Sequence, residues 1–529
     1  MTIPTNDLEN GLPTLSQPMP TGDHIVEDPK LRRSILLTVC IALMAVIAAV
    51  TGLNVAQPHL ALDLGASQSE VLWMINVYAI SLAALLLPLG AVGDRWGRKP
   101  VLLLGLGIFG LANILAGLAP TIEIMMAARF LSGLGAAMIM PVTLSVITSV
   151  FPDEERSKAI GVWTGVAGAG GILGMFLSAV LVDFLSWRGL FVLPVALVVI
   201  SALLAVKNVP NSRQSSAHGF DVAGSVLSVL AIIGVSFALH EGPAQGWATV
   251  QTLTALVLGI GAFIAFLLWE LRHPEPLLDI RHFKQRGLSS GSVSLTVWFG
   301  VQAGVFVVLY PFFQAVLGWS GLLATVGLMP MAVCMMVFSG IAPLMSAKVS
   351  PKVTIAGGVL LGGTGLALMA QFVSVDGGYL SVLPGMIAMG IGMGFAMAPS
   401  TEAITSALPR EQQGVASALN DVTRELGTSL GVALLGAVFA AGYSRAATPM
   451  IQDFPQEASL AASKNIANAM ALAEQGLPHG DALYSAAKEA FVQGWQQAMW
   501  AGVVIMAVLF VYVALRGPLT PQSAERAAT

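Results

Sequence analysis

The sequence predicts an all-α polytopic membrane protein with fourteen membrane-spanning helices. Of its 529 residues, 56% are hydrophobic and only 10% are charged, a composition far more apolar than that of a soluble domain. The apolar residues are also gathered into runs of roughly 20 residues or more, the length with which an α-helix crosses the hydrocarbon core of a bilayer. Composition and run length together indicate a chain that crosses the membrane many times.

The predicted spans fall into three groups along the chain. Residues 35–206 hold six spans, residues 207–287 hold two inserted spans with their flanking loops, and residues 288–516 hold six more. The flanks 1–34 and 517–529 are expected to be tails, the first of them disordered because it is polar and contains several prolines. The individual spans are predicted at about 35–58, 71–91, 100–119, 122–146, 157–182, 188–206, 221–241, 249–270, 288–316, 321–346, 353–373, 380–401, 413–441 and 495–516.

The positions of lysine and arginine predict which side of the membrane each loop faces. Loops on one side carry nearly all of these cations, whereas the opposite loops, at about 59–70, 119–121, 242–248 and 374–379, carry none. Cytoplasmic loops are the ones enriched in lysine and arginine, so we expect a cell-membrane protein with both termini cytoplasmic. The outer segment 444–490 is the exception, and its many alanines predict short surface helices. Its cations are Arg445, Lys464 and Lys488.

The two six-span groups are predicted to be copies of each other. A shift of 257 positions takes Gly133 to Gly390 and Gly135 to Gly392. Two parallel six-span halves around a midplane cavity are the plan of alternating-access transporters. The same shift relates Gln57 to Gln314, Pro152 to Pro409, Glu154 to Glu411, Gly170 to Gly427 and Gly174 to Gly431.

A charged loop between the second and third spans is the most distinctive stretch of the chain. Its sequence, Gly90-Ala-Val-Gly-Asp-Arg-Trp-Gly-Arg-Lys-Pro100, sets one acid and three cations between two long apolar runs. Charged side chains are expensive in hydrocarbon, so the stretch is predicted to be a tight, water-facing turn. The helix that begins near Pro100 offers unpaired N–H groups, which would stabilise a nearby acid. We expect a conformational latch made of Gly90, Asp94, Arg95, Gly97, Arg98 and Lys99.

This loop resembles the signature loop between spans two and three of the major facilitator superfamily. Three more stretches resemble the fourteen-span drug:proton antiporter branch of that superfamily: Arg129-Phe-Leu-Ser-Gly-Leu-Gly135, Ser186-Trp-Arg-Gly-Leu-Phe-Val-Leu-Pro194 and Phe220-Asp-Val-Ala-Gly224. The resemblance covers nearly the whole chain. It implies the major facilitator fold, two six-helix halves with two inserted helices, and multidrug efflux by antiport, powered by the proton gradient without a cofactor.

Departures from the family's pattern bear on the proton relay. Ala49 stands where the family usually carries an acid in the first span, ahead of the stretch Asn54-Val-Ala-Gln57-Pro58. In the second span Asn76 stands where some members carry an acid, and in the fifth the expected Gly-Pro motif reads Gly174-Met175. The first half is therefore predicted to hold no carboxylate deep in the membrane.

Arg129 lies well inside the fourth predicted span. The resemblance gives it a role near the cavity, in handling protons or substrate. The alternative is structural, with the cation hydrogen-bonded to helix ends and to Asn54 or Gln57. Because an unpaired buried arginine is costly, either reading requires that it find polar partners or water.

A second group of deep charges lies in the thirteenth span, in Asp421-Val-Thr-Arg424-Glu425. At about 1.5 Å per residue from Gln413, Asp421 is about 12 Å deep and Glu425 is near the midplane. Their i, i+4 spacing puts both carboxylates on one helix face, where one should hold a proton because two neighbouring acids do not both ionise cheaply in a dry site. The alternative is an Asp421–Arg424 ion pair that only staples the helix. We expect proton coupling to involve Asp421, Glu425, Arg129 and Arg424.

Aromatic and amide side chains are candidates to line the substrate cavity, since ring faces suit flat or cationic substrates. The alternative for each is packing between helices or against lipid. The candidates are Asn54, Gln57, Trp73, Asn76, Tyr78, Trp163, Trp298, Phe306, Tyr310 and Gln314.

Three functions stay open at this point. The first is a secondary active exporter of lipophilic or amphipathic compounds, cations among them, driven by proton antiport. The second is a weakly coupled or uncoupled exporter or flippase of a lipid or apolar metabolite, which the missing first-span acid favours. The third is a membrane sensor that does not transport.

Other classes have no support in the sequence. There is no nucleophile–base spacing and no metal-ligand cluster, so we expect neither an enzyme nor a metal site. The chain lacks a Walker-type phosphate loop, and a net charge of −4 gives no hint of nucleic-acid binding. We expect a monomer whose only partner is a small lipophilic substrate or a lipid.

Overall fold

The computed structural model describes residues 25–212, 220–475 and 479–518. The predicted tails lie largely outside these residues, and so do the side chains at 54–59, 61, 62, 68, 183 and 244. The long helices are α1 (Pro29–Leu64), α2 (Gln68–Trp96), α3 (Arg98–Gly117), α4 (Ile122–Val150), α5 (Asp153–Phe184), α6 (Val192–Asn208), α7 (Val222–Gln245), α8 (Val250–Arg272), α9 (Arg286–Pro311), α10 (Gly321–Lys348), α11 (Pro351–Phe372), α12 (Gly378–Thr405), α13 (Gln413–Met450) and α16 (Gly480–Arg516). Between them lie α14 (Gln456–Ala462), α15 (Ile466–Glu474) and the short turns η1 (Trp187–Phe191), η2 (Ile280–Lys284), η3 (Phe312–Val316) and η4 (Arg410–Gln412).

The prediction of an all-helical membrane protein is confirmed. Within the described residues, fourteen helices are long and apolar enough to cross a membrane, and they are the fourteen long helices above. Several begin or end beyond the predicted limits: α1 begins at Pro29 instead of residue 35, and α16 begins at Gly480 instead of residue 495. Hydropathy marks only the lipid-crossing part of a helix, so the polar turns at its ends were missed.

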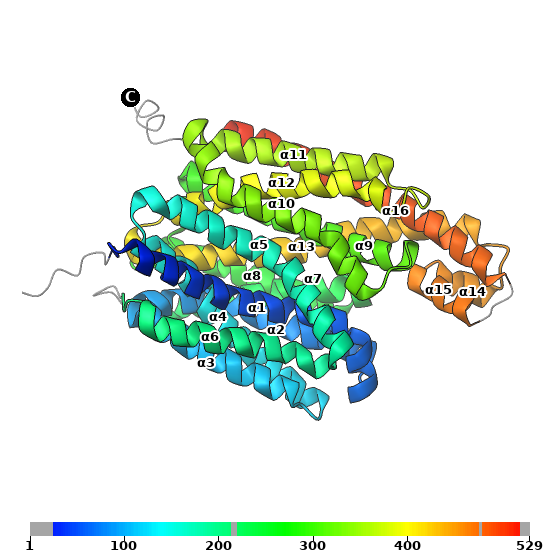
Figure 1. The fold of residues 1–529 in the computed structure, drawn as a ribbon, viewed down its shortest axis with the longest axis horizontal. Coiled ribbons are helices and arrows are strands. Elements are labelled where there is room, and N and C mark those ends of the chain that lie inside the picture. Colours follow the sequence, from blue (N-terminus) through cyan, green and yellow to red (C-terminus); the bar gives the residue numbers. More distant parts are fainter. Residues whose placement is uncertain (1–24, 213–219, 476–478, 519–529) are drawn as a thin grey trace, which may run out of the picture.

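The helices form two six-helix bundles that lie side by side (Figure 1). The amino-terminal half consists of α1–α6, and the carboxy-terminal half consists of α9–α13 and α16. Helix α1 begins and α16 ends at the same end of the molecule, at the left of Figure 1. The loops at this end carry Arg95, Arg98, Arg156, Lys348 and Arg410, and we call it the basic side.

The internal repeat reappears in the packing. A Cβ atom at Gly133 of α4 would lie 2.7 Å from the carbonyl oxygen of Tyr78 in α2, and one at Gly390 of α12 would lie 2.5 Å from that of Met331 in α10. The next glycine in each copy, Gly135 or Gly392, permits the same close approach to α3 or α11. Matched glycines thus hold matched helix pairs together, because only a missing side chain lets two backbones approach so closely.

The inserted helices α7 and α8 form a hairpin, and α7 packs on α2 and α13, one helix from each half. The Asp221 side chain starts the hairpin by accepting a hydrogen bond from the Gly224 N–H at 2.8 Å, as N-terminal caps do. The same carboxylate accepts a bond from Trp269 Nε1 of α8 at 3.0 Å. Asp221 thereby holds α7 and α8 together at the basic side, and α7 covers the junction between the halves.

The segment 444–490 forms helices, as its composition predicts. Helices α13 and α16 extend into it, and α14 and α15 project from the end of the molecule at the right of Figure 1. The Tyr443 hydroxyl donates to the carbonyl oxygen of Ala462 at 2.7 Å and ties α14 to α13. Residues 476–478 of this segment lie outside the described residues.

Candidate functional site

The charged loop joins the two halves through Asp94. This carboxylate accepts hydrogen bonds from the Gly414 N–H at 2.9 and 2.8 Å and from the Val415 N–H at 3.3 Å. Arg98 donates to it at 3.2 Å. Asp94 therefore caps the N-terminus of α13, where unpaired N–H groups and the helix dipole favour a negative charge.

Two details of the loop correct the sequence prediction. Asp94 and Arg98 do not face water, since each is only 7% exposed. The acid caps α13 of the other half, whereas the N-terminal cap of α3, Gly97, offers no side-chain bond. Sequence spacing could not show this, because Gly414 lies 320 positions further along the chain than Asp94.

The remaining loop residues have separate tasks. A Cβ atom at Gly90 would lie 2.6 Å from the carbonyl oxygen of Gly414, so this glycine lets α2 touch α13. Gly97 turns the chain at φ +106°, in the left-handed region that glycine tolerates. Lys99 donates to the carbonyl oxygen of Val206 in α6 at 2.7 Å, and the Arg95 guanidinium lies 5.9 Å from the ring of Phe220.

Sequence reasoning missed a second contact between the halves. The Ser157 hydroxyl of α5 donates to the Glu402 carboxylate of α12. Nearby, the Ser339 hydroxyl of α10 donates to the carbonyl oxygen of Gly161 in α5 at 2.8 Å. A signal existed for Glu402, because a carboxylate at the very end of an apolar run needs a partner.

These bonds between the halves all lie in the basic-side part of the bundle. The ion pair of Arg410 with Asp153, at 3.6 Å, lies there too. The basic ends of the halves are thus held together by α2 with α13 and by α5 with α10 and α12.

Arg129 is fully buried between α1, α2 and α4. Its guanidinium donates to the carbonyl oxygens of Met74 and Ala49, both at 3.3 Å. It lies 4.3 Å from the centre of the Tyr78 ring. Its Nη1 atom has no hydrogen-bond partner, and no ion pair joins it to a described residue. The cation is therefore held by a ring face and two long bonds, while the side chains of Asn54 and Gln57 lie outside the described residues.

Asp421 and Arg424 form an ion pair on α13. Arg424 donates to the Asp421 carboxylate at 3.3 Å, and both side chains are buried. The Arg424 guanidinium also lies 4.6 Å from the Phe299 ring of α9 and 5.5 Å from the Trp163 ring of α5. Arg424 of the carboxy-terminal half thus lies beside an aromatic ring of each half. Both ring faces stabilise its positive charge, in addition to the Asp421 carboxylate.

Glu425 is the acid that lacks a partner. No hydrogen bond or ion pair joins its carboxylate to a described residue, and its side chain is only partly buried. Arg424 lies one position and Asp421 four positions before it on the same helix. Of the two acids in the middle of α13, Asp421 is thus ion-paired and Glu425 has no ionic partner among the described residues.

The cavity candidates whose side chains are described do not gather in one place. Tyr78 and Trp163 contact the two deep arginines, Arg129 and Arg424, and are themselves fully buried. Trp73 stacks obliquely on Phe237 of α7, with ring centres 5.3 Å apart. Asn76 and Phe306 are partly exposed on α2 and α9. The Tyr310 hydroxyl donates to the carbonyl oxygen of Gly321 at 3.4 Å, beside Gln314, at the ends of α9 and α10 that lie away from the basic side.

Trp298 lies inside the carboxy-terminal half. It is fully buried, and a Cβ atom at Gly362 of α11 would lie 2.1 Å from its ring. The indole therefore fills a notch beside Gly362 in the carboxy-terminal half. An apolar ring on a buried face of a helix packs where a glycine leaves room, and sequence periodicity does not reveal that notch.

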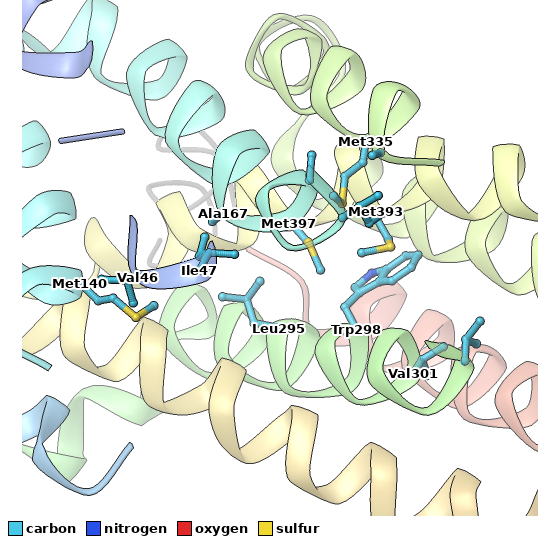
Figure 2. Close-up of a cluster of buried hydrophobic side chains, with 14 of the residues drawn as sticks. Val46, Ile47, Met140, Ala167, Leu295, Trp298, Val301, Met335, Met393 and Met397 are labelled. Atoms are coloured by element: carbon cyan, nitrogen blue, oxygen red, sulfur yellow. The ribbon is translucent and has the colours of Figure 1, made fainter. Parts of the chain in front are cut away.

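The centre of the molecule is apolar and rich in methionine. Figure 2 shows side chains of both halves gathered there, with Val46, Ile47, Met140 and Ala167 on one side and Leu295, Met335, Met393 and Met397 on the other. Thioether side chains adapt to different shapes. Within the described residues, no group of three or more His, Cys, Asp or Glu side chains could hold a metal ion.

Comparison with known proteins agrees with this arrangement. Residues 39–432 match the family model of the Major Facilitator Superfamily. The methyl viologen resistance protein SmvA of Salmonella typhimurium is 30% identical over 469 residues, which cover 87% of this chain and 93% of that protein. The multidrug efflux pump LfrA of Mycolicibacterium smegmatis is 30% identical over 472 residues, covering 88% of this chain and 93% of that protein.

Solved structures agree at the level of fold. A bacterial homologue of the human lysosomal transporter Spinster, in an inward-facing and unoccupied conformation, is similar with a TM-score of 0.59 and 20% identity. The match covers 93% of this chain and 100% of that one.

Proposed function

Because this chain belongs to the Major Facilitator Superfamily, we propose that it exports lipophilic or amphipathic compounds by alternating access, driven by proton antiport. The observation that carries the proposal is its likeness, over most of both chains, to proteins named for resistance and efflux. Methyl viologen is a flat dication, and cations are therefore included among the proposed substrates. The proposed protein works as a monomer, with the proton gradient in place of a cofactor.

The basic side is proposed to face the cytoplasm. Cytoplasmic loops of membrane proteins are enriched in lysine and arginine, and Arg98, Lys99, Arg156 and Arg410 lie on this side. The bonds from Asp94 to α13 and from Ser157 to Glu402 then close the cytoplasmic end. On this proposal, the arrangement corresponds to the state that releases substrate outward.

Alternating access supplies a role for the latch. To load substrate from the cytoplasm, the basic ends of the halves must part, and the Asp94 carboxylate must leave the N-terminus of α13. A hydrogen bond to a charged group contributes about 1.5–3 kcal/mol. Two such bonds favour the state that is closed on the basic side but still allow the protein to leave it. Asp94 is therefore proposed to set the balance between the two states.

The proton is proposed to bind on α13. In the described spans of the amino-terminal half, acids lie only near the helix ends, while the carboxy-terminal half offers Asp421 and Glu425 further inside. Asp421 is engaged by Arg424, whereas Glu425 pairs with no described residue and is partly exposed. Glu425 is thus the proposed carrier, with Asp421 and Arg424 tuning its affinity for the proton through their charges.

The substrate is proposed to bind between the halves, near this group. Apolar and thioether side chains fill the centre (Figure 2), which favours lipophilic compounds. The rings of Trp163 and Phe299 already hold one cation, Arg424. A lipophilic cation that displaces this guanidinium would find the same ring faces and the Asp421 carboxylate.

A second candidate function is an uncoupled or weakly coupled exporter of a lipid or apolar metabolite. It is favoured by Ala49, which meets Arg129 through its backbone carbonyl oxygen and offers no carboxylate for a proton relay. A sensor that does not transport is the remaining alternative, and no contact among the described residues favours it.

One experiment separates these functions. Inside-out vesicles that contain the protein are given an acidic interior, and uptake of a fluorescent lipophilic cation is compared with uptake of a labelled lipid. The proposal predicts that the gradient drives accumulation of the dye and that a protonophore abolishes it. Lipid movement that ignores the gradient would support the second candidate, and no movement of either probe would support the sensor.

A further inference from the structure

We propose that Asp221 of α7 and Glu270 of α8 form a proton-dependent clamp on the linker 273–279, which joins the inserted hairpin to η2. Glu270 is a carboxylic acid that donates a hydrogen bond to the ionised Asp221, and the clamp opens when Glu270 loses its proton. The pair lies at the basic side and therefore responds to the pH there. This inference goes beyond the proposed export and depends neither on the substrate nor on the coupling ion.

The first observation is that the two carboxylates meet at Gly224. A Cβ atom on this glycine would lie 2.3 Å from Glu270 Oε1 and 2.4 Å from Asp221 Oδ2, so both oxygens occupy the space beside the missing side chain. Glu270 has no solvent exposure, and Asp221 is only 5% exposed. Two carboxylates that lie side by side in a buried site do not both ionise, because water does not screen their repulsion.

The second observation is that no ion pair joins either carboxylate to a described residue. The Arg281 guanidinium donates instead to the carbonyl oxygen of Leu271 at 2.9 Å. On the neighbouring α13 no charged residue lies between Gln413 and Asp421. A shared proton is therefore the available way to relieve the repulsion. The charged and titratable side chains at this corner of α2, α8, the linker and η2 are Asp94, Arg95, Arg272, His273, Glu275, Asp279, Arg281, His282 and Lys284.

The donors around Asp221 favour its ionised form. The carboxylate accepts hydrogen bonds from the Gly224 N–H at 2.8 Å, from Trp269 Nε1 at 3.0 Å and from the Leu277 N–H at 3.3 Å. It also caps the N-terminus of α7, where the helix dipole stabilises a negative charge. Asp221 is thus the member of the pair that gives up its proton.

The surroundings of Glu270 favour its protonated form. Its Oε2 atom accepts one hydrogen bond, from the Leu278 N–H at 3.0 Å. Its Oε1 atom is buried and has no hydrogen-bond partner, although it lies beside Asp221 Oδ2 at Gly224. A carboxyl group that carries a proton is a donor as well as an acceptor. A proton on Oε1 therefore turns an unpaired atom into the donor that Asp221 can receive.

The pair fastens the linker through two backbone amides. The N–H groups of Leu277 and Leu278 donate to Asp221 and to Glu270 respectively, and both leucine side chains are buried. When the O–H bond of Glu270 breaks and its proton passes to water on the basic side, two negative charges lie side by side. Their repulsion separates the carboxylates, and the linker loses the acceptors of both amides.

The direction of the pH effect follows from linkage. In the open state Glu270 meets water and ionises at about pH 4.3, as an ordinary glutamic acid does. In the clamped state it holds its proton to higher pH. The clamp is therefore strongest below about pH 4.3 and weakens by up to about tenfold per pH unit as pH rises, until the clamped acid itself ionises.

Hydrogen–deuterium exchange of the full-length protein in detergent tests the clamp. Protection factors, which correct for the intrinsic effect of pH on exchange, are measured for a peptide that covers Leu277 and Leu278, with α11 as the internal reference. Between about pH 6 and about pH 8, protection in the parent should fall by at least about tenfold relative to α11. Glu270→Gln keeps a donor for Asp221 but cannot ionise, so it should hold the higher protection of the parent at both pH values.

Two outcomes of this experiment would overturn the inference. One is the same pH dependence in the parent and in Glu270→Gln. The other is a Glu270→Gln protein whose linker is unprotected already at the lower pH, because the amide would then fail to replace a carboxylic acid. Neither outcome bears on the proposed export, since the assay contains no substrate and no proton gradient.

A steric variant keeps the inference testable if Glu270→Gln does not fold. Gly224→Ala sets a methyl group between the two carboxylates, so protection of the linker should fall at least about fivefold at the lower pH and depend less on pH. Gly261→Ala, on the same hairpin, is the matched control because nothing lies within 4 Å of its Cβ position. Equal protection in the two glycine variants would show that the carboxylates do not meet at Gly224 and would overturn the clamp.

Discussion

The backbone N–H of Gly414 donates to both oxygens of the Asp94 carboxylate, at 2.9 and 2.8 Å, so that a side chain of one half caps a helix of the other. This bond exists only while the basic ends of the halves are together. It therefore links a local hydrogen bond to the global state of the protein.

Asp94→Asn should weaken the state that is closed on the basic side and cripple transport without unfolding the protein. The amide keeps one acceptor but loses the charge that the helix dipole and Arg98 stabilise, a loss of about 1–3 kcal/mol. Dye export in vesicles would fall about tenfold or more, and a thermal unfolding curve would show an intact fold. Normal transport by a well-expressed Asp94→Asn protein would contradict the latch.

Gly90→Val should have a similar effect by a steric route. The new side chain would start 2.6 Å from the Gly414 carbonyl oxygen and 2.7 Å from the Ala418 side chain, and such overpacking costs about 1–3 kcal/mol. Labelling of a cysteine placed at the basic ends should become faster. Gly107→Val on α3 is the matched control, since nothing lies within 4 Å of its Cβ position. Equal behaviour of the two variants would exclude a steric role for Gly90.

Only part of the latch could be predicted from the sequence. The charge pattern around Asp94 predicts a functional loop, and the shift of 257 residues predicts two similar halves. Neither identifies Gly414 as the partner or shows that Ser157 meets Glu402, because contacts between the halves depend on which state the protein occupies. The contacts within each half follow the repeated glycines and were more accessible to prediction.

The surroundings of the aromatic residues could not be predicted from the sequence. Trp73, Trp163 and Trp298 look alike in sequence, as rings in apolar helices, and the structure gives them three different surroundings. Trp73 meets the inserted hairpin, Trp163 lies beside Arg424, and Trp298 fills the notch at Gly362. Helical periodicity assigns a face to each residue but does not say which helix that face meets.

Arg129→Lys should lose most transport activity although it keeps the charge. The planar guanidinium of Arg129 reaches the carbonyl oxygens of Met74 and Ala49 and lies by the Tyr78 ring. The ammonium group of a lysine cannot reproduce this forked arrangement. Initial rates of dye export from vesicles with matched protein amounts measure the loss. A fully active Arg129→Ala variant would show that the cation is dispensable.

Trp298→Ala should destabilise the protein before it affects specificity. Removing a fully buried aromatic ring costs about 3–5 kcal/mol, and the notch beside Gly362 would become a cavity. The apparent melting temperature in detergent should fall markedly. Trp500→Ala is the control, because that ring on α16 is 46% exposed and should leave the melting temperature nearly unchanged. A larger fall in melting temperature for Trp500→Ala than for Trp298→Ala would contradict the structural role of Trp298.

The central claim is that the proton travels on Glu425. Proteoliposomes with a trapped pH dye, and no imposed proton gradient, can be loaded with a lipophilic cation whose downhill exit is followed together with the internal pH. The account predicts that exit of the cation through the parent protein brings protons in, while Glu425→Gln releases the cation without a pH change. Proton entry at the parental rate through Asp421→Asn/Glu425→Gln would contradict it and place the proton site elsewhere.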